Sequence, residues 1–534
     1  MDISYILRTV GDPLKDDCRD RIALQYEDRE SITYAELLNR VRRAMGGLHI
    51  LGVEPGDRVA LVMYNSIDYW VLYFAITGLG GIVVKLNWRL TAEELQYAVD
   101  DCGANIVMAS PELASSIGFL ADSRTTRVVS AGVPFEFGAH RACDATMRDI
   151  LAADPIDFPS EPWSSSTPAV IMYTSGTTGR PKGAVWTHGN ALGYAWMQAL
   201  QWGFDSSTKA LTTGPFYHVG AFENLLTPTL LMKGTAIFMQ STGFSVERAA
   251  RLMGDLSATC ALLYPFMIND LVTLDPRILN RLGSLSMLVT GGSAIAPSTV
   301  RELHRLVPTV GLVQTYGSTE GGAIATASVP EDAIDLPECV GQSFTLTEVI
   351  VCNDDVATPV ETGEIGEVWI RSPSVCVGYW NKPEETDATF VDRWCRTGDL
   401  GRINDRGRLQ ITGRKKDMIR SGGENVYPAE VEMVLTDHGS IADMAVIGIP
   451  DRRFEEVVCA VVVLKPGAHL DPEEFRRYAR SRLARFKVPS YVEVVDALPR
   501  TASGKVQKFV LRDRFAHLAD TRTTHDLPSA NDRP

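Results

Sequence analysis

The stretch that most constrains how this chain folds is residues 173–185, which read YTSGTTGRPKGAV. The apolar run at 169–172 is typical of a buried strand, so the loop is predicted to lie at a strand end, where α/β folds bind ligands. Glycines let a backbone approach a ligand closely, and successive N–H groups in such a loop form a concavity suited to anions. The pattern therefore predicts a phosphate-binding loop. Its candidate residues are Thr174, Ser175, Gly176, Thr177, Thr178, Gly179 and Lys182.

Two other interpretations of this loop compete with a phosphate site. A generic loop of glycine, serine and threonine is more often a flexible surface turn, and the preceding apolar run is what favours a ligand site here. A P-loop is excluded, because Pro181 precedes the lysine and the GxxxxGK[ST] pattern cannot be fitted to the string.

Four further motifs follow this loop in order along the chain. They read QTYGSTE at 314–320, RTGDL at 396–400, GRKKDMIRSGGENVYPAEVE at 413–432 and PRTASGKVQK at 499–508. Together with TSGTTGRPKG, they resemble the adenylate-forming superfamily of acyl- and aryl-CoA synthetases, peptide-synthetase adenylation domains and beetle luciferases. Five ordered motifs over nearly the whole chain make a chance match negligible. The similarity is greatest to fatty-acyl and aryl-CoA ligases.

Helix and strand patterns alternate in the N-terminal part of the chain. Runs at 58–63, 82–86 and 105–109 are typical of buried strands, and Thr91 with Glu94 forms a capping-box pattern before an amphipathic run. Strands that alternate with helices imply a parallel, doubly wound sheet. The predicted fold class is therefore α/β.

The length of 534 residues exceeds what one compact core holds, so more than one domain is expected. The predicted N-terminal domain, residues 1–415, consists of doubly wound mixed sheets with helices and holds the ATP and acyl sites. A small α+β domain, residues 416–518, follows, and the polar segment 519–534 is predicted to be disordered. The resemblance implies that the small domain is a mobile lid with the catalytic lysine, and that Lys416 is its hinge residue.

Three runs beyond the boundary predict the elements of the small domain. The apolar runs at 444–449 and 457–464 are typical of strands, and the charged run at 471–485 is typical of a helix. This mixture indicates a small α+β fold.

The composition of the chain argues against several classes of function. The net charge of −14 argues against nucleic acid as a partner, because nucleic-acid binders carry a basic footprint. The nine cysteines are scattered without a CxxC pair, which indicates reduced thiols and no zinc site.

The most apolar run, 69–84, is too short for a membrane span and contains glycines, so it predicts a buried helix followed by a buried strand. With no basic, apolar signal-peptide pattern at the N-terminus, a cytoplasmic protein without a transmembrane segment is expected.

The QTYGSTE motif contains the most informative carboxylate, Glu320. A carboxylate in a tight, glycine-flanked turn near phosphates is a reasonable Mg²⁺ ligand, because Mg²⁺ prefers one or two carboxylates plus phosphate oxygens. The resemblance implies the same metal role and makes Glu320 catalytic. The local sequence predicts that Asp399 lies in a turn, and the resemblance implies that it accepts the ribose hydroxyls. The resemblance also implies that Lys505 is the catalytic lysine. The other nucleotide residues implied are Gly292, Tyr316 on adenine, Gly317, Thr319 at the α-phosphate, and Arg414.

The stretch 211–222, LTTGPFYHVGAF, has the composition of a pocket wall. A lone histidine is more often a satisfied core residue, but the resemblance implies that His218 gates the adenylate site and takes part in catalysis. Segments 261–266 and 288–293 line the acyl pocket and the adenine site in the family. The predicted acyl pocket consists of His218, Val219, Phe222, Tyr264, Gly291 and Gly317, and its apolar members favour a hydrophobic acid.

Residues for CoA are implied by the resemblance alone. Rotation of the small domain between the two steps brings the segment after the hinge to the pantetheine channel, which is a hinge motion. Ser490 stands where many relatives carry an arginine, so part of the basic contact is missing. The implied CoA residues are Arg89, Ser421, Gly422, Gly423, Phe486 and Lys487.

The predicted function is an ATP-dependent carboxylic acid–CoA ligase that forms AMP through an acyl-adenylate, with ATP, Mg²⁺ and CoA as cofactor and co-substrates. A stand-alone enzyme that loads a carrier protein is the alternative. An amino acid is disfavoured because FYHVGAFEN at 216–224 lacks the aspartate that peptide synthetases use, although Glu223 lies further along. Luciferase-like oxidation and a non-catalytic relative are weaker alternatives. The partners expected are the acid, ATP and CoA, and a homodimer and a carrier protein are left open.

Overall fold

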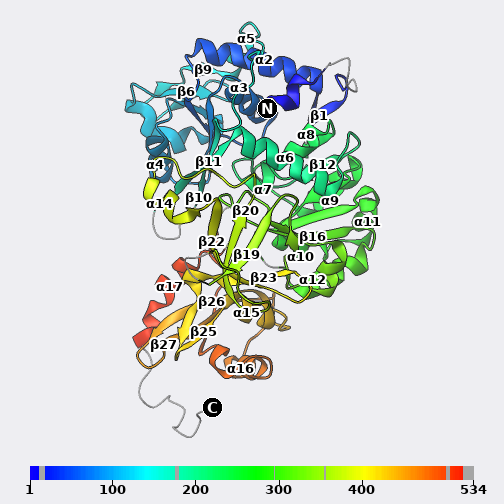
Figure 1. Cartoon of the computed structure of the whole chain (residues 1–534), viewed down its shortest axis with the longest axis vertical. Coiled ribbons are helices and arrows are strands. Elements are labelled where there is room, and N and C mark those ends of the chain that lie inside the picture. The colour runs from blue at the N-terminus through cyan, green and yellow to red at the C-terminus, as the bar shows by residue number, and fades with distance from the viewer. Residues whose placement is uncertain (11–17, 175–179, 294, 354–356, 501–505, 521–534) are drawn as a thin grey trace.

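The predicted parallel, doubly wound sheet is present in the computed structural model, which describes residues 1–10, 18–174, 180–293, 295–353, 357–500 and 506–520 (Figure 1). Strands β10, β4, β3, β5, β6 and β9 pair in parallel, and β11 closes the edge antiparallel to β10. In spatial order the strands are β11 (Lys182–Thr187), β10 (Pro168–Thr174), β4 (Ile82–Lys85), β3 (Arg58–Val62), β5 (Ile106–Ala109), β6 (Arg127–Ser130) and β9 (Ala145–Thr146).

A second, nine-stranded sheet lies beside the first and supplies the other half of the large unit. Its central strands run parallel, so their C-terminal ends meet at one edge. In spatial order it comprises β18 (Gln342–Ser343), β17 (Thr326–Ala327), β16 (Gly311–Tyr316), β15 (Met287–Gly291), β14 (Cys260–Leu262), β12 (Lys209–Thr212), β13 (Thr235–Phe238), β1 (Ile22–Tyr26) and β2 (Glu30–Thr33). Strands β7 (Glu136–Phe137) and β8 (Arg141–Ala142) form a separate hairpin.

Helices cover both faces of the first sheet, which explains its continuous apolar strands. Val59 and Leu61 of β3 belong to a core that contains α3, whereas Ala60 and Val62 face a second core that contains α4. The predicted capping box of α4 is present, with Thr91 and Glu94 each bonded to the other's backbone N–H. The helices are α1 (Tyr5–Arg8), α2 (Tyr34–Ile50), α3 (Ile67–Gly78), α4 (Ala92–Cys102), α5 (Met147–Ala152), α6 (His188–Trp202), α7 (Val219–Phe222), α8 (Leu226–Leu231), α9 (Val246–Asp255), α10 (Pro265–Leu271), α11 (Pro276–Leu279), α12 (Pro297–Leu306), α13 (Pro330–Asp335) and α14 (Pro383–Thr389).

The most apolar run of the chain forms a buried helix and a strand, as predicted. It spans most of α3, where every residue except Asp68 is buried, and continues into β4. Across the described part of the chain, no helix has both the length and the apolar character that a membrane span needs. All nine cysteines are free in this structure, and eight of them are buried, with Cys143 at intermediate exposure.

A third sheet connects the large unit to the C-terminal unit (Figure 1). It consists of β19 (Glu348–Cys352), β20 (Gly366–Arg371), β22 (Trp394–Ile403) and β21 (Phe390–Val391), with β23 (Leu409–Arg414) paired to β22. The chain leaves this sheet at the end of β23, makes one short 3₁₀ turn at Lys415–Asp417, and enters a different sheet at β24. The domain limits at 415 and 518 remain predictions.

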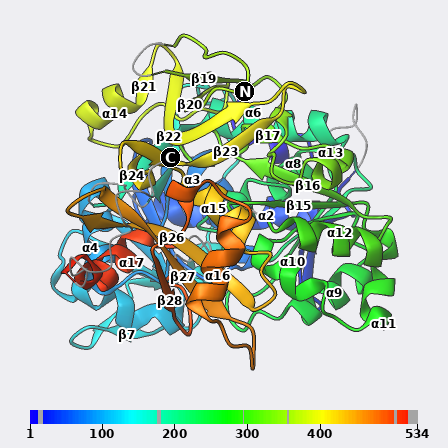
Figure 2. The ribbon, with the colours of Figure 1, turned by 90° about the horizontal axis from the view of Figure 1, so that it is seen from below.

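The C-terminal unit is a sheet with helices on both faces (Figure 2). Alternate residues of β26 and β27 face α15 and α16 on one side and α17 on the other, which is why the middle of both strands is apolar. The strands are β25 (Glu424–Val426), β24 (Ile419–Ser421), β27 (Glu455–Leu464), β26 (Ile441–Asp451) and β28 (Tyr491–Val494), and the helices are α15 (Pro428–Leu435), α16 (Pro472–Arg480) and α17 (Lys508–Phe515).

Two local predictions were wrong. The helix predicted over 471–485 ends at Arg480, because Leu483 and Val488 turn back onto the core that holds Phe475. Asp399 lies within strand β22 and not in a turn. The turn-like composition around it comes from Gly398, whose φ of +68° lets a strand bend where other residues would be strained.

Candidate active site

Glu320 lies at the junction between the two large sheets. It belongs to the segment that follows β16, and its Oε1 accepts hydrogen bonds from Thr174 Oγ1 at 2.8 Å and from Tyr379 Oη at 3.1 Å. Thr174 is the last residue of β10, so one carboxylate joins the end of a strand of the first sheet to the segment that follows β16 of the second. Gly322, with a φ of +87°, makes the turn after Glu320, and a Cβ there would lie 2.2 Å from Ser374 Oγ.

Glu320 has no ion-pair partner in the described structure, although the Arg414 guanidinium interacts with it electrostatically. Its two hydrogen-bond partners are neutral hydroxyls, and no lysine or arginine of the described ranges forms an ion pair with it. Lys182 approaches only indirectly, with its Nζ 5.1 Å from the centre of the Tyr379 ring. Thr319, the preceding residue, is held through its carbonyl by Trp186 Nε1 at 2.9 Å. A carboxylate held by hydroxyl donors keeps acceptor positions for a further ligand.

A second cluster of polar side chains forms around Tyr316, the last residue of β16. Tyr316 Oη donates to Asp399 Oδ2 at 2.8 Å, and Arg414 Nε donates to Asp399 Oδ1 at 2.9 Å. Asp399 and Arg414 are opposite each other on β22 and β23, so the strand register positions this pair. Burial raises the pKa of Tyr316 well above its usual value, so its hydroxyl stays protonated and donates. A carboxylate has about four acceptor positions, so Asp399 can still accept from a diol.

The acyl-pocket candidates meet where three parallel strands end. Tyr264 follows β14, Gly291 ends β15 with Gly292 next to it, and Gly317 follows β16. These strands are neighbours in the second sheet, so their ends lie at one edge, the usual ligand edge of an α/β sheet. The ring of His218 lies edge-on to that of Tyr264, with centroids 6.5 Å apart.

His218 and the helix it begins form one wall of this region. The His218 ring accepts a hydrogen bond from Gly220 N at 3.0 Å and caps α7. Val219 is 6% exposed, but Phe222 is fully buried and its ring stacks on Trp70 at 3.8 Å. Phe222 therefore belongs to the aromatic core around α3, behind the surface that Val219 and His218 present.

A buried ion pair fixes the far end of α7. Lys85 Nζ contacts both carboxylate oxygens of Glu223, at 2.7 and 2.8 Å, and the two side chains are 0% and 2% exposed. Burial lowers the pKa of Lys85 and raises the pKa of Glu223, and each charge opposes the shift of the other. The sequence analysis missed this pair. Its only sequence signal is a lysine inside the otherwise apolar run IVVKL at 82–86.

The CoA candidates lie in two separate parts of the molecule. Arg89 is in the large unit, where its Nη1 donates to Tyr217 Oη at 3.0 Å and its guanidinium lies 4.1 Å from the Trp88 ring. Ser421, Gly422 and Gly423 lie at the tight turn between β24 and β25 of the C-terminal unit. Phe486, 36% exposed, and Lys487, paired with Glu430 at 2.6 Å, belong to a 3₁₀ turn of the same unit. None of the described contacts of Arg89 reaches these C-terminal residues.

Some predicted residues have no structural account. Lys505 and residues Ser175, Gly176, Thr177, Thr178 and Gly179 lie outside the described residues. Lys416 lies in the 3₁₀ turn between the third and fourth sheets, next to Asp417, which pairs with Arg512 of α17 at 2.5 Å. Tyr379 was missed by the sequence analysis, and nothing in its local sequence indicates a contact with Glu320.

The residues around Glu320 fit a Mg²⁺ ion that is bound together with a nucleotide. In the described ranges, no group of three or more His, Cys, Asp or Glu residues could hold a metal ion. Mg²⁺ in nucleotide sites takes one or two carboxylates and completes its shell with phosphate oxygens and water. Glu320, with its neutral hydroxyl partners, matches that requirement.

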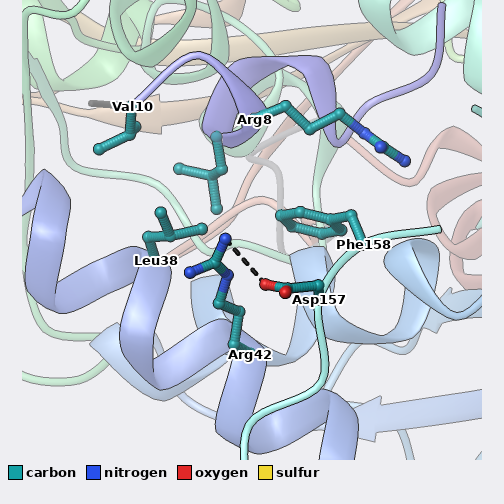
Figure 3. Close-up of a pocket in the computed structure, with 7 residues that line it drawn as sticks. Arg8, Val10, Leu38, Arg42, Asp157 and Phe158 are labelled. Atoms are coloured by element: carbon teal, nitrogen blue, oxygen red, sulfur yellow. Dashed lines mark ion pairs between the residues drawn. The ribbon is translucent and has the colours of Figure 1, made fainter. Parts of the chain in front are cut away.

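A cavity of about 220 Å³ lies elsewhere, between α1 and α2 (Figure 3). Arg42 pairs there with Asp157 at 2.8 Å, and Arg8 lies over the Phe158 ring at 5.3 Å. It shares no residue with the groups around Glu320, Asp399 or Tyr264.

Known proteins match this chain over nearly its whole length. The AMP-binding enzyme model matches residues 14–380, and the AMP-binding enzyme C-terminal domain model matches residues 430–505. Indoleacetate–CoA ligase from Aromatoleum aromaticum is 34% identical over 503 residues, which cover 93% of this chain and 95% of that protein. Feruloyl-CoA synthase from Amycolatopsis sp. is 36% identical over 490 residues, which cover 91% and 94%. The crystal structure of ATP-bound MatB from Rhodopseudomonas palustris superposes with a TM-score of 0.87 at 30% identity and covers 97% of this chain and 100% of that one.

Proposed function

This chain belongs to the AMP-binding enzyme family and is an AMP-forming acyl-CoA synthetase, and we propose that it activates a hydrophobic fatty, aryl or cyclic acid. The observation that best supports the proposed site is the meeting of β10, β16 and the third sheet at Glu320 and Asp399. Relatives named as ligases of indoleacetate and as feruloyl-CoA synthase, both similar over more than nine-tenths of this chain, favour an aromatic or cyclic acid among these classes.

In the first step, a carboxylate oxygen of the acid attacks the α-phosphorus of ATP and pyrophosphate leaves. Negative charge builds on the α-phosphate oxygens and on pyrophosphate. Mg²⁺ bound by Glu320 would neutralise part of that charge. Thr174 orients the Glu320 carboxylate, and Lys182, Thr319 and Lys505 are proposed phosphate contacts. Preorganised contacts of this kind are each worth about 10²–10³ in rate.

The nucleotide is proposed to bind across the second and third sheets. Asp399 accepts the ribose hydroxyls, with Arg414 and Tyr316 fixing the position of its carboxylate. The ring of Tyr316 faces the base, and the glycines at 292 and 317 let adenine approach the strand ends closely.

In the second step, the CoA thiol attacks the acyl carbon, a thioester forms and AMP leaves. A free thiol has a pKa of about 8.5, so a small thiolate fraction is present at neutral pH. We propose that the C-terminal unit rotates about Lys416, which moves Lys505 away and brings the 421–423 turn toward the acyl carbon. Arg89, Phe486 and Lys487 would then bind the CoA nucleotide. We expect the enzyme to act in the cytoplasm, where ATP and CoA are available.

The test is to supply ATP, Mg²⁺ and CoA with a panel of fatty, aryl and cyclic acids and to measure AMP and acyl-CoA. The proposal expects a CoA-dependent thioester that the Lys505→Ala variant does not form. Pyrophosphate exchange without thioester would move the acceptor to a carrier protein. No exchange with any acid in the panel would contradict the proposal.

A further inference from the structure

Tyr264 is a buried aromatic residue at the ligand edge of the second sheet. It follows β14, precedes α10, and is 7% exposed. Its ring meets the His218 ring edge-on and lies about 4 Å from where a Cβ on Gly292 would stand. The residue therefore lies next to the two other segments proposed to hold the acid.

The hydroxyl of Tyr264 has no hydrogen-bond partner within the described ranges, although it is buried. Leaving a buried donor unpaired costs about 1–3 kcal/mol. Burial raises the pKa of Tyr264 well above its usual value, so the group stays a neutral O–H that can donate. A phenylalanine would fill the same space without the cost of an unpaired donor, so packing alone does not account for the hydroxyl.

Two glycines keep the space beside this hydroxyl free of side chains. A Cβ on Gly214 would lie 3.2 Å from Tyr264 Oη, and a Cβ on Gly220 would lie 3.6 Å from it. Gly220 is on α7, the wall that His218 begins, so the hydroxyl lies close to the start of this helix. A larger residue at either glycine would contact the oxygen and occupy the position of a partner.

The surroundings of a second unpaired tyrosine show that Tyr264 is different. The hydroxyl of Tyr73 also lacks a partner among the described residues, but its ring packs between Phe74 and Phe222 in the aromatic core. Tyr73 lies on α3, whereas Tyr264 lies at a strand end. Tyr264, unlike Tyr73, combines an unpaired donor with glycines at the proposed substrate site.

We infer that the Tyr264 hydroxyl donates a hydrogen bond to an oxygen atom on the body of the acid, away from its carboxylate. The substrate is then an oxygen-bearing aryl or cyclic acid, such as a phenol or a ketone, and not a plain hydrocarbon acid. This inference rests on the proposed function and makes Tyr264 a specificity-determining residue. The rest of the wall, with Val219, contacts the apolar part of the molecule.

The test compares matched acids that differ only in one oxygen. Suitable pairs are p-coumaric with cinnamic acid, a keto-substituted cyclohexylpropanoic acid with its cyclohexyl parent, and a keto fatty acid with the unsubstituted chain. For at least one pair, kcat/KM of the wild-type enzyme should favour the oxygen-bearing member about tenfold or more. Tyr264→Phe should reduce that preference to near unity, mainly through a fall of about tenfold in kcat/KM for the oxygen-bearing acid.

Tyr73→Phe is the matched control, because it removes the same atom from a tyrosine outside the proposed contact. It should keep the wild-type preference. Loss of the preference in both variants, or its survival in Tyr264→Phe, would overturn the inference. If the wild-type enzyme turned over both members of every pair equally, the inference would be wrong but the proposed function would stand. If no acid gave thioester or pyrophosphate exchange, both the proposed function and the inference would be wrong.

Discussion

Glu223 and Glu320 are two carboxylates near the ends of the proposed substrate site, and their surroundings are opposite. Glu223 is 2% exposed and is held by the ammonium of Lys85 through both of its oxygens. Glu320 is only partly buried and is held through one oxygen by two neutral hydroxyls. The charge of Glu223 is paired within the fold, whereas Glu320 has no ion-pair partner among the described residues, which is the arrangement the proposed Mg²⁺ site needs.

The comparison separates a carboxylate that stabilises the fold from one that we propose acts on substrate. A buried charge must be paired where it stands, because removing it from water is expensive. The Lys85–Glu223 pair joins the end of β4 to α7 and so fixes the wall of the acyl region. Glu320 joins β10 to the segment after β16, and its unpaired charge is suited to a metal–nucleotide complex.

The largest expected effect follows from removing one member of the buried pair. Glu223→Gln leaves Lys85 buried without a counter-charge, so the free energy of unfolding should fall by about 3–5 kcal/mol. Urea denaturation followed by fluorescence would measure it. The double variant Lys85→Met/Glu223→Gln should lose less, because no uncompensated charge remains. If the folded Glu223→Gln protein instead lost catalysis without losing stability, the comparison would fail.

The opposite result is expected at Glu320. Glu320→Gln should leave the urea midpoint close to that of the wild type, because no ion pair within the described structure is broken. The rate of acid-dependent pyrophosphate exchange should fall about 10²–10³-fold. If Glu320→Gln lowered the urea midpoint strongly but left the exchange rate per folded molecule unchanged, Glu320 would be a structural residue like Glu223.

A variant at Asp399 tests whether a buried carboxylate that is paired with an arginine can also bind substrate. Asp399→Asn removes the charge that Arg414 pairs with and weakens the acceptor proposed for the ribose. Hydrogen bonds to charged groups are worth about 1.5–3 kcal/mol, so KM for ATP should rise at least about tenfold. Steady-state kinetics with the acid saturating would measure it, and an unchanged KM for ATP would exclude the ribose contact.

The smallest effects concern the hydroxyls that hold Glu320. Thr174→Val and Tyr379→Phe each remove one neutral hydrogen bond, worth about 1 kcal/mol, so each should slow pyrophosphate exchange about fivefold. The double variant should lose more than either single variant. Rates equal to the wild type in both single variants would show that these hydroxyls do not orient the carboxylate.

The sequence predicted the sheet that carries the phosphate loop because its strands are short apolar runs with helix caps between them. It predicted Glu320, Asp399 and Tyr264 as site residues only through motifs and resemblance, and the structure brings each of them to a sheet edge or a sheet junction. Tyr379 and Lys85 could not be predicted as partners, because their contacts join residues 59 and 138 positions apart in the chain. Asp399 was misplaced in a turn because a strand bent at Gly398 has the composition of a turn.

The most direct test of the central claim is the Mg²⁺ dependence of pyrophosphate exchange in the wild type and in Glu320→Gln. If Glu320 holds the metal–nucleotide complex, the half-saturating Mg²⁺ concentration should rise about tenfold or more in the variant. Thr174→Val, which keeps the carboxylate, should shift it much less. An identical Mg²⁺ dependence in the wild type and in Glu320→Gln would contradict the account and leave Glu320 as a structural residue of the turn.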